Sequence, residues 1–114
     1  MSFMGNRMLR TAALASGLAT LSFIVPVAKA QSPAEKNYTK NCAACHGADG
    51  SANTPAGKAT KALDFHSAAV KNQTDDQLAA AIAKGKTPMP GYEKQLKPDE
   101  IKDLVAYVKM LGSK

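Results

Sequence analysis

Two cysteines and one histidine are the residues best suited to chemistry in this chain of 114 residues. Cys42, Cys45 and His46 follow the pattern Cys-x-x-Cys-His, a spacing typical of covalent attachment of a c-type haem. Positions i, i+3 and i+4 share one face of a helix, so two thiols and one imidazole would point the same way. The thiols could each bond to a vinyl group of one porphyrin, and the imidazole could reach the iron as an axial ligand.

Other chemistry is compatible with the same residues. Two cysteines of an exported protein could form a disulfide, and a Cys-x-x-Cys pair at a helix start can be a redox site with one acidic thiol. That redox site expects a strand before the helix, and no strand pattern precedes Cys42. A zinc site needs a fourth ligand, and the sequence offers only His66 and no third cysteine. Haem attachment is the favoured interpretation.

Residues 1–30 are predicted to be a cleaved signal peptide. Arg7 and Arg10 give a positive start, a mostly apolar run covers 11–27, and residues 28–30 read Ala-Lys-Ala, the small-x-small pattern of a cleavage site. An uncleaved membrane anchor is the competing interpretation, but polar residues dilute the run and it is short for a span. The sequence therefore predicts export, with the periplasm as the location.

Cleavage would leave one small domain over residues 31–114, which contains no further segment able to cross a membrane. This part has 12 lysines, no arginine and nine acidic residues, hence a net charge of +3. Contacts to nucleic-acid bases favour arginine, so a nucleic-acid reader is not expected. The domain has no tryptophan and only four Phe or Tyr residues. Such small domains usually need a disulfide, metal or cofactor for stability, and a buried porphyrin would supply that core.

The first predicted helix carries the cysteines. It begins with Ser32 as N-cap and Pro33 in the first turn, runs through both cysteines and ends at Gly47. Tyr38 lies on the same stripe as the cysteines, so we expect it to pack inward. A second helix is predicted over 74–84, with Thr74 as N-cap and Gly85 at the end.

The final helix is predicted to begin at Lys97 and Pro98 and to stop at Gly112. We expect it to pack against the first helix and the cofactor only. Its apolar residues recur at helical spacing, namely Ile101, Leu104, Val105, Val108 and Leu111.

The segments between the helices are predicted to be irregular. Residues 47–61 read as a loop that could wrap the His46 side of the porphyrin. An iron-bound imidazole usually donates its second N–H to a carbonyl, and Pro55 or a neighbour is the expected acceptor, an ordinary surface turn being the alternative. Over 62–70 a short helix or turn is expected, with Phe65 in the core.

Met89 stands between Pro88 and Pro90. The prolines restrict the backbone on both sides, and a sulfur held in this way suits a metal ligand. The alternative is a methionine that fills a gap in the core. Met110 lies inside the last helix and is expected to pack there, and His66 is expected to be exposed or hydrogen-bonded.

Together these residues resemble the small soluble class I cytochromes c of bacteria. The resemblance covers nearly all of 31–114 and rests on the Cys-Ala-Ala-Cys-His-Gly run at 42–47, on Met89-Pro90 and on the closing run 100–108. One departure is Ala34, where the family often has glycine.

The resemblance implies an all-α class I cytochrome c fold. Three to four helices would wrap around one covalently attached haem, and the N- and C-terminal helices would cross. Cys42 and Cys45 would form the thioethers of haem c, and His46 and Met89 would be the axial iron ligands.

The expected function is soluble electron transfer between redox partners outside the cytoplasm, without enzyme activity. Two axial ligands leave no vacancy on the iron, and His/Met ligation raises its potential. Docking would be transient, on a monomer, helped by lysines near the motifs, namely Lys58, Lys61, Lys84 and Lys86. Three alternatives stay open: a haem protein with an open distal site (a peroxidase or gas sensor), a haem-free thiol oxidoreductase, and a permanent module of a respiratory enzyme.

Overall fold

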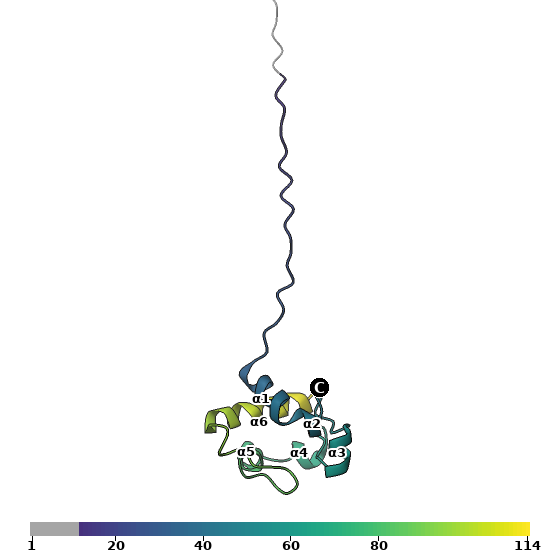
Figure 1. Cartoon of the computed structure of the whole chain (residues 1–114), viewed down its shortest axis with the longest axis vertical. Coiled ribbons are helices and arrows are strands. Elements are labelled where there is room, and N and C mark those ends of the chain that lie inside the picture. The colour runs from purple at the N-terminus through teal and green to yellow at the C-terminus, as the bar shows by residue number, and fades with distance from the viewer. Residues whose placement is uncertain (1–11) are drawn as a thin grey trace, which may run out of the picture.

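The computed structural model of the protein describes residues 12–114. Arg7 and Arg10 of the expected signal peptide lie outside the described residues. Within them the secondary structure is helical, and the six helices are α1 (Pro33–Asn41), α2 (Ala43–His46), α3 (Pro55–Thr60), α4 (Ala68–Lys71), α5 (Asp75–Lys84) and α6 (Pro98–Gly112). Residues 12–32 form no regular element and extend away from the helices (Figure 1). In 12–114 no helix has the length and apolar character needed to span a membrane.

The N- and C-terminal helices pack against each other, as expected. α1 and α6 lie together next to the extended segment, with α3, α4 and α5 on the other side of the molecule (Figure 1). Tyr38 of α1 and Leu104 of α6 are each only 1% exposed, so their contact region is the most deeply buried part of the core. The expectation that α6 packs only on α1 and the cofactor is wrong, because α5 contributes Leu78 and Ile82 to the same core.

Helix ends follow the predicted capping residues. The Ser32 hydroxyl accepts the N–H of Glu35 at 3.1 Å, and Thr74 and Gln77 cap α5 reciprocally. Each of the five predicted apolar positions of α6 is buried. These hydrogen bonds satisfy N–H groups that a helix start would otherwise leave without partners.

The helix count exceeds the expected three to four for two reasons. Cys42 has φ −121° and ψ −37°, so the first helix is divided there into α1 and α2. Residues 55–60, predicted as loop, form α3 instead. Its signal is present in the sequence, because Thr54 caps it and Pro55 is its first residue, the same arrangement that marks α1. α4 is the short helix expected within 62–70.

Candidate functional site

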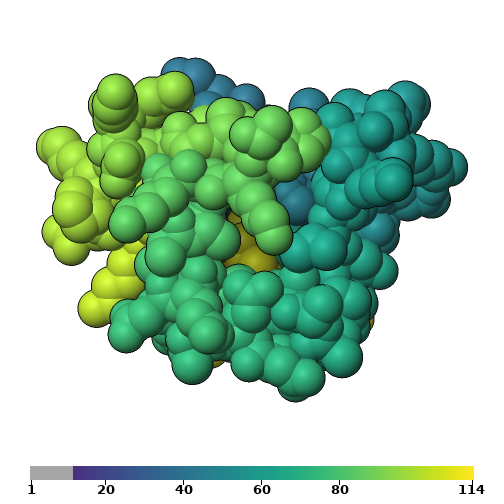
Figure 2. All heavy atoms as spheres, turned by 90° about the horizontal axis from the view of Figure 1, so that it is seen from below, coloured from purple at the N-terminus to yellow at the C-terminus, as the bar shows by residue number. Residues whose placement is uncertain are grey.

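The four residues singled out by their chemistry line one cavity. Cys42, Cys45, His46 and Met89 surround a volume of about 410 Å³, although Met89 is far from the others in sequence. The junction of α1 and α2 forms one wall, residues 60–63 another, and the segment after α5 a third. Figure 2 shows a hollow on the face away from the extended segment, with atoms of α6 visible at its bottom.

A smaller cavity of about 80 Å³ continues inward from the first. Cys42, His46, Leu63 and Met89 line both cavities. The remaining lining of the inner cavity is mostly apolar core, namely Tyr38, Phe65, Val70, Gln73, Leu78, Ala81, Ile82, Leu104 and Val108. The site is therefore a slot that has a partly polar mouth and an apolar interior.

The His46 imidazole is oriented by a backbone carbonyl. Its Nδ1 lies 3.0 Å from the carbonyl oxygen of Leu63. A carbonyl can only accept, so Nδ1 carries the proton and Nε2 is the nitrogen available to a metal. The expectation of Pro55 as acceptor is wrong. Pro55 belongs to the first turn of α3, where carbonyls point along the helix toward later N–H groups.

Side chains also hold the turn that follows His46. Gly47 has φ +80°, a conformation that glycine adopts without strain, and its carbonyl accepts the hydroxyl proton of Tyr38 at 2.6 Å. Burial raises the pKa of Tyr38, so the hydroxyl stays protonated and able to donate. The Thr54 hydroxyl lies 2.9 Å and 2.8 Å from the carbonyls of Ala44 and Cys45. These contacts join α2 to α3.

The cysteines do not have the properties of a redox-active pair. Both side chains are partly buried, and they form no disulfide with each other. Burial, and then the neighbouring Cys45, raise the pKa of Cys42 to about 11, whereas a nucleophilic thiol needs a lowered pKa. Within residues 12–114, no group of three His, Cys, Asp or Glu side chains is arranged to hold a metal ion. The thiol-redox and zinc interpretations therefore gain no support from the geometry.

Met89 reaches the slot from the segment after α5 and is half-buried. Its backbone forms two hydrogen bonds with Lys86, with Met89 as donor at 2.7 Å and as acceptor at 3.0 Å. The following Tyr92 donates its hydroxyl proton to the carbonyl of Asn41 at 2.8 Å. This bond, which the sequence did not predict, ties the methionine segment to the end of α1.

The competing axial candidates lie away from the slot. His66 lines neither cavity, and its Nδ1 lies 2.7 Å from a carboxylate oxygen of Asp64, which agrees with the expected hydrogen-bonded histidine. Met110 also lines neither cavity. The expectation that it packs inside is wrong, because its position on α6 leaves it 40% exposed.

Comparisons with known proteins agree with this geometry. The sequence model of the family described as cytochrome c oxidase, cbb3-type, subunit III matches residues 29–108. A cytochrome c6 of Nostoc sp. (strain PCC 7120 / SAG 25.82 / UTEX 2576) is 33% identical over 96 residues, covering 83% of this chain and 84% of the relative. The chain belongs to the class I monohaem cytochromes c.

Two further comparisons match this cytochrome c. A cytochrome c6 of Limnospira maxima is 35% identical over 74 residues, covering 62% of this chain and 81% of the relative. The solved structure of the KustC0563 c-type cytochrome is 30% identical, with a TM-score of 0.63 over 68% of this chain and 95% of that one. The all-α cytochrome c fold and the covalent c-type haem are thereby confirmed.

The residues present in the slot fit a haem. Two thiols stand at its partly polar mouth, and the imidazole of His46 has only Nε2 available. The inner lining is almost entirely apolar, which suits the flat hydrocarbon part of a porphyrin. A cytochrome c of this size also needs such a group to complete its core.

Proposed function

We propose that this cytochrome c is a one-electron carrier in which Cys42 and Cys45 form the two thioethers and His46 and Met89 are the axial ligands. One observation carries the proposal. All four side chains, supplied by two segments distant in sequence, line the same cavity. The bound haem supplies a single iron that alternates between Fe(II) and Fe(III). The chain's own residues determine which ligands reach that iron and how polar its surroundings are.

Three features of the chain support electron transfer rather than catalysis. The Leu63 carbonyl at Nδ1 of His46 raises the basicity of the imidazole and fixes its orientation. The apolar inner lining disfavours the additional positive charge of the oxidised state. With His46 on one side and Met89 on the other, no axial position is left for oxygen or peroxide.

The mouth of the slot is a suitable place for transient docking. Of the four lysines expected near the haem edge, Lys61 and Lys86 line the cavity. Positive charge at the opening of the slot favours a small, salt-sensitive interface with an acidic redox partner. We propose that the free protein is a monomer that exchanges partners, and binding that weakens as salt is raised would test this.

We further propose that residues 1–30 are removed on export and that the domain 31–114 works in the periplasm. In residues 12–30 every side chain is exposed, among them Leu14, Leu18 and Phe23. Within residues 12–114 the first helix begins at Pro33. Export with removal of the segment is compatible with both observations. The mass of the protein isolated from a periplasmic fraction tests it, because cleavage after Ala30 predicts Gln31 as the first residue.

Two spectra test the central proposal. Protein made with a working haem-attachment system should give the pyridine haemochrome spectrum of a haem bound by two thioethers. The oxidised protein at neutral pH should also show the near-infrared band of methionine bound to ferric iron. A haemochrome without that band would favour the alternative with an open distal site, and a colourless protein would contradict the proposal altogether.

A further inference from the structure

The imidazole of His46 is stacked on the ring of Phe65. The two ring centroids lie 4.7 Å apart, and the planes are inclined by 26°. Two residues earlier in the same segment, the Leu63 carbonyl accepts the Nδ1 proton. A hydrogen bond fixes one atom of a ring but lets the plane rotate about that bond. A flat aromatic face against the ring removes this second freedom.

Phe65 is itself held firmly. It is 7% exposed, and its N–H donates to the carbonyl of Gly50 at 2.8 Å. A Cβ on Gly50 would lie 2.6 Å from Cδ2 of Phe65, and a Cβ on Gly112 would lie 2.6 Å from its carbonyl oxygen. Tyr38 packs against the ring in an edge arrangement, with centroids 6.2 Å apart. The two glycines allow this close approach, so Phe65 is a fixed surface for His46.

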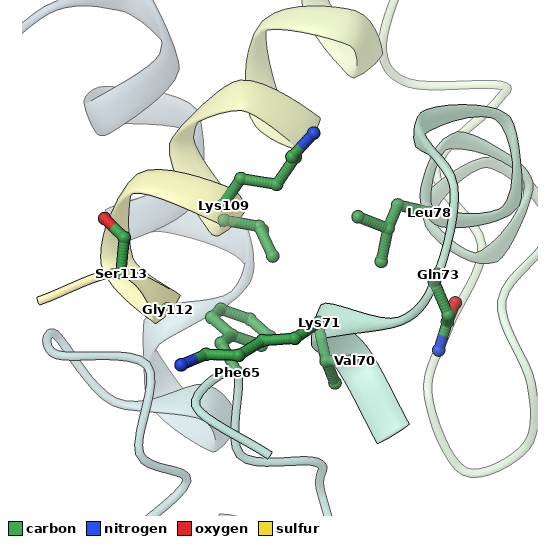
Figure 3. Close-up of a pocket in the computed structure, with 9 residues that line it drawn as sticks. Phe65, Val70, Lys71, Gln73, Leu78, Lys109, Gly112 and Ser113 are labelled. Atoms are coloured by element: carbon green, nitrogen blue, oxygen red, sulfur yellow. The ribbon is translucent and has the colours of Figure 1, made fainter. Parts of the chain in front are cut away.

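Phe65 is one of five residues, with Val70, Gln73, Leu78 and Val108, that lie between the haem slot and a second cavity. This outer cavity, of about 380 Å³, lies between α4, α5 and the end of α6. Figure 3 shows the Phe65 ring at its floor, with the Lys71 side chain extending past the ring and Leu78 on the opposite side. Phe65 lines the inner haem cavity as well. Removing its ring would join the two spaces on the side where His46 lies.

We propose that Phe65 is a positioning residue for the axial histidine. Its face sets the plane of the His46 imidazole about the iron–nitrogen bond, and its bulk separates that imidazole from the outer cavity. This inference rests on the proposed function, in which His46 is an axial ligand. The plane of an axial imidazole determines how unpaired electron density is distributed over the haem of the ferric protein. Phe65 therefore acts on the haem through His46.

The test compares three variants of the haem-loaded protein. Phe65→Leu keeps an apolar side chain but removes the flat face, and Phe65→Tyr restores it. Ile101→Ala is the control, since Ile101 is 6% exposed and lines neither haem cavity. The readouts are the hyperfine-shifted haem methyl resonances of the ferric protein, hydrogen exchange of the Nδ1 proton of His46 in the ferrous protein, and the equilibrium with a redox mediator.

Phe65→Leu should change the order or spread of the methyl resonances and raise the exchange rate of the Nδ1 proton roughly tenfold, because water gains access. The mediator equilibrium should shift toward the ferric protein by up to about tenfold, equivalent to about 59 mV for one electron. Phe65→Tyr should retain the wild-type methyl pattern. Ile101→Ala should lose thermal stability and leave the pattern and the exchange rate unchanged.

Wild-type spectra keep the two hypotheses separate. If the near-infrared methionine band and the axial histidine signals are present but Phe65→Leu leaves the methyl pattern unchanged, the positioning role is overturned and the electron carrier stands. If those signals are missing from the wild type, the proposed function fails first. Should Phe65→Leu not fold, contacts between the ring protons of Phe65 and His46 in the ferrous wild type decide, and their absence overturns the inference.

Discussion

The two sides of the haem slot are built in different ways. On the His46 side, the ligand ring itself is held, by the Leu63 carbonyl at Nδ1 and by the stacked ring of Phe65. On the Met89 side, the hydrogen bonds of the ligand residue itself involve only its backbone, which pairs with Lys86. A thioether is a weak acceptor and offers no donor. The imidazole is therefore fixed by its own contacts, whereas the methionine sulfur is positioned only through its segment.

This difference predicts which ligand is easier to displace. The nearest side-chain hydrogen bond in the Met89 segment runs from the hydroxyl of Tyr92 to the carbonyl of Asn41, whereas Phe65, which stacks on His46, is a core residue. A segment with few anchoring contacts opens at a lower free-energy cost than one packed in the core. We expect Met89 to leave the iron under conditions that leave His46 bound.

The largest effect on folding should come from removing the haem, which both sides of the slot contact. In a Cys42→Ala/Cys45→Ala variant the haem cannot be attached, and the slot of about 410 Å³ loses the group that completes the core. A domain of this size rarely reaches a few kcal/mol of stability without such a group. We expect circular dichroism to show a largely unfolded chain without a cooperative thermal transition. A sharp transition in haem-free protein would contradict the idea that haem is the centre of the core.

Met89→Ala should show most clearly that the two axial ligands are held independently. The haem should remain attached with His46 bound, while the near-infrared methionine band disappears and the potential falls. Ferric protein should bind cyanide at least about tenfold more tightly, about 1.4 kcal/mol, because no ligand has to be displaced. Met110→Ala is the matched control and should change none of these. If Met89→Ala keeps the band, the distal ligand is another methionine, and Met110→Ala should then remove it. His66 would be tested if the wild type lacks the band.

On the His46 side, Tyr38→Phe should cause a smaller loss of folding stability. The substitution leaves the buried carbonyl of Gly47 without the hydroxyl that donates to it at 2.6 Å. An unsatisfied buried acceptor costs about 1–3 kcal/mol, which denaturant unfolding of the haem protein would measure. Tyr107→Phe is the control, because the Tyr107 hydroxyl makes no hydrogen bond to another residue within 12–114. Equal losses in both variants would assign the effect to general packing.

Local signals in the sequence were enough to predict where α1, α5 and α6 begin and which face of α6 is buried. The N-caps at Ser32 and Thr74 and the apolar stripe of α6 lie within a few residues of the structure they determine. The same local rule would have found α3, since Thr54-Pro55 has the form of a cap and a first helical residue. The Cys-x-x-Cys-His run belongs to this class too, because it is a pattern within one turn of chain.

The contacts that hold the site residues in place were harder to predict, because they depend on the tertiary fold. Any residue can offer a backbone carbonyl, so no residue type marks Leu63 as the acceptor for His46. The bond from Tyr92 to Asn41 spans 51 residues, and no periodic pattern encodes such a pair. Phe65 was expected in the core, but its stacking on His46 follows only once the segments around Gly50 and Gly112 are in place.

The smallest predicted effect concerns acid stability of the segment that holds His46. Asp64 stands between Leu63 and Phe65, and its carboxylate accepts hydrogen bonds from the backbone N–H of His66 at 2.9 Å and from its imidazole at 2.7 Å. The backbone bond first, and then the side-chain bond, lower the pKa of Asp64. A lowered pKa stabilises the folded state above the ordinary carboxyl pKa of about 3.9, and this contribution is lost as the pH falls through the lower folded value.

Asp64→Asn keeps an oxygen acceptor but removes this titration. The variant should melt slightly below the wild type at neutral pH, and the two melting curves should converge as the pH falls below about 4. Thermal melts of the haem protein between neutral and acid pH would measure the difference. A constant gap at every pH would mean that Asp64 acts through its shape alone. Convergence together with faster exchange of the His46 Nδ1 proton in acid would show that protonation of Asp64 loosens the segment that holds His46. The binding of Met89 need not change, because Met89 belongs to another segment.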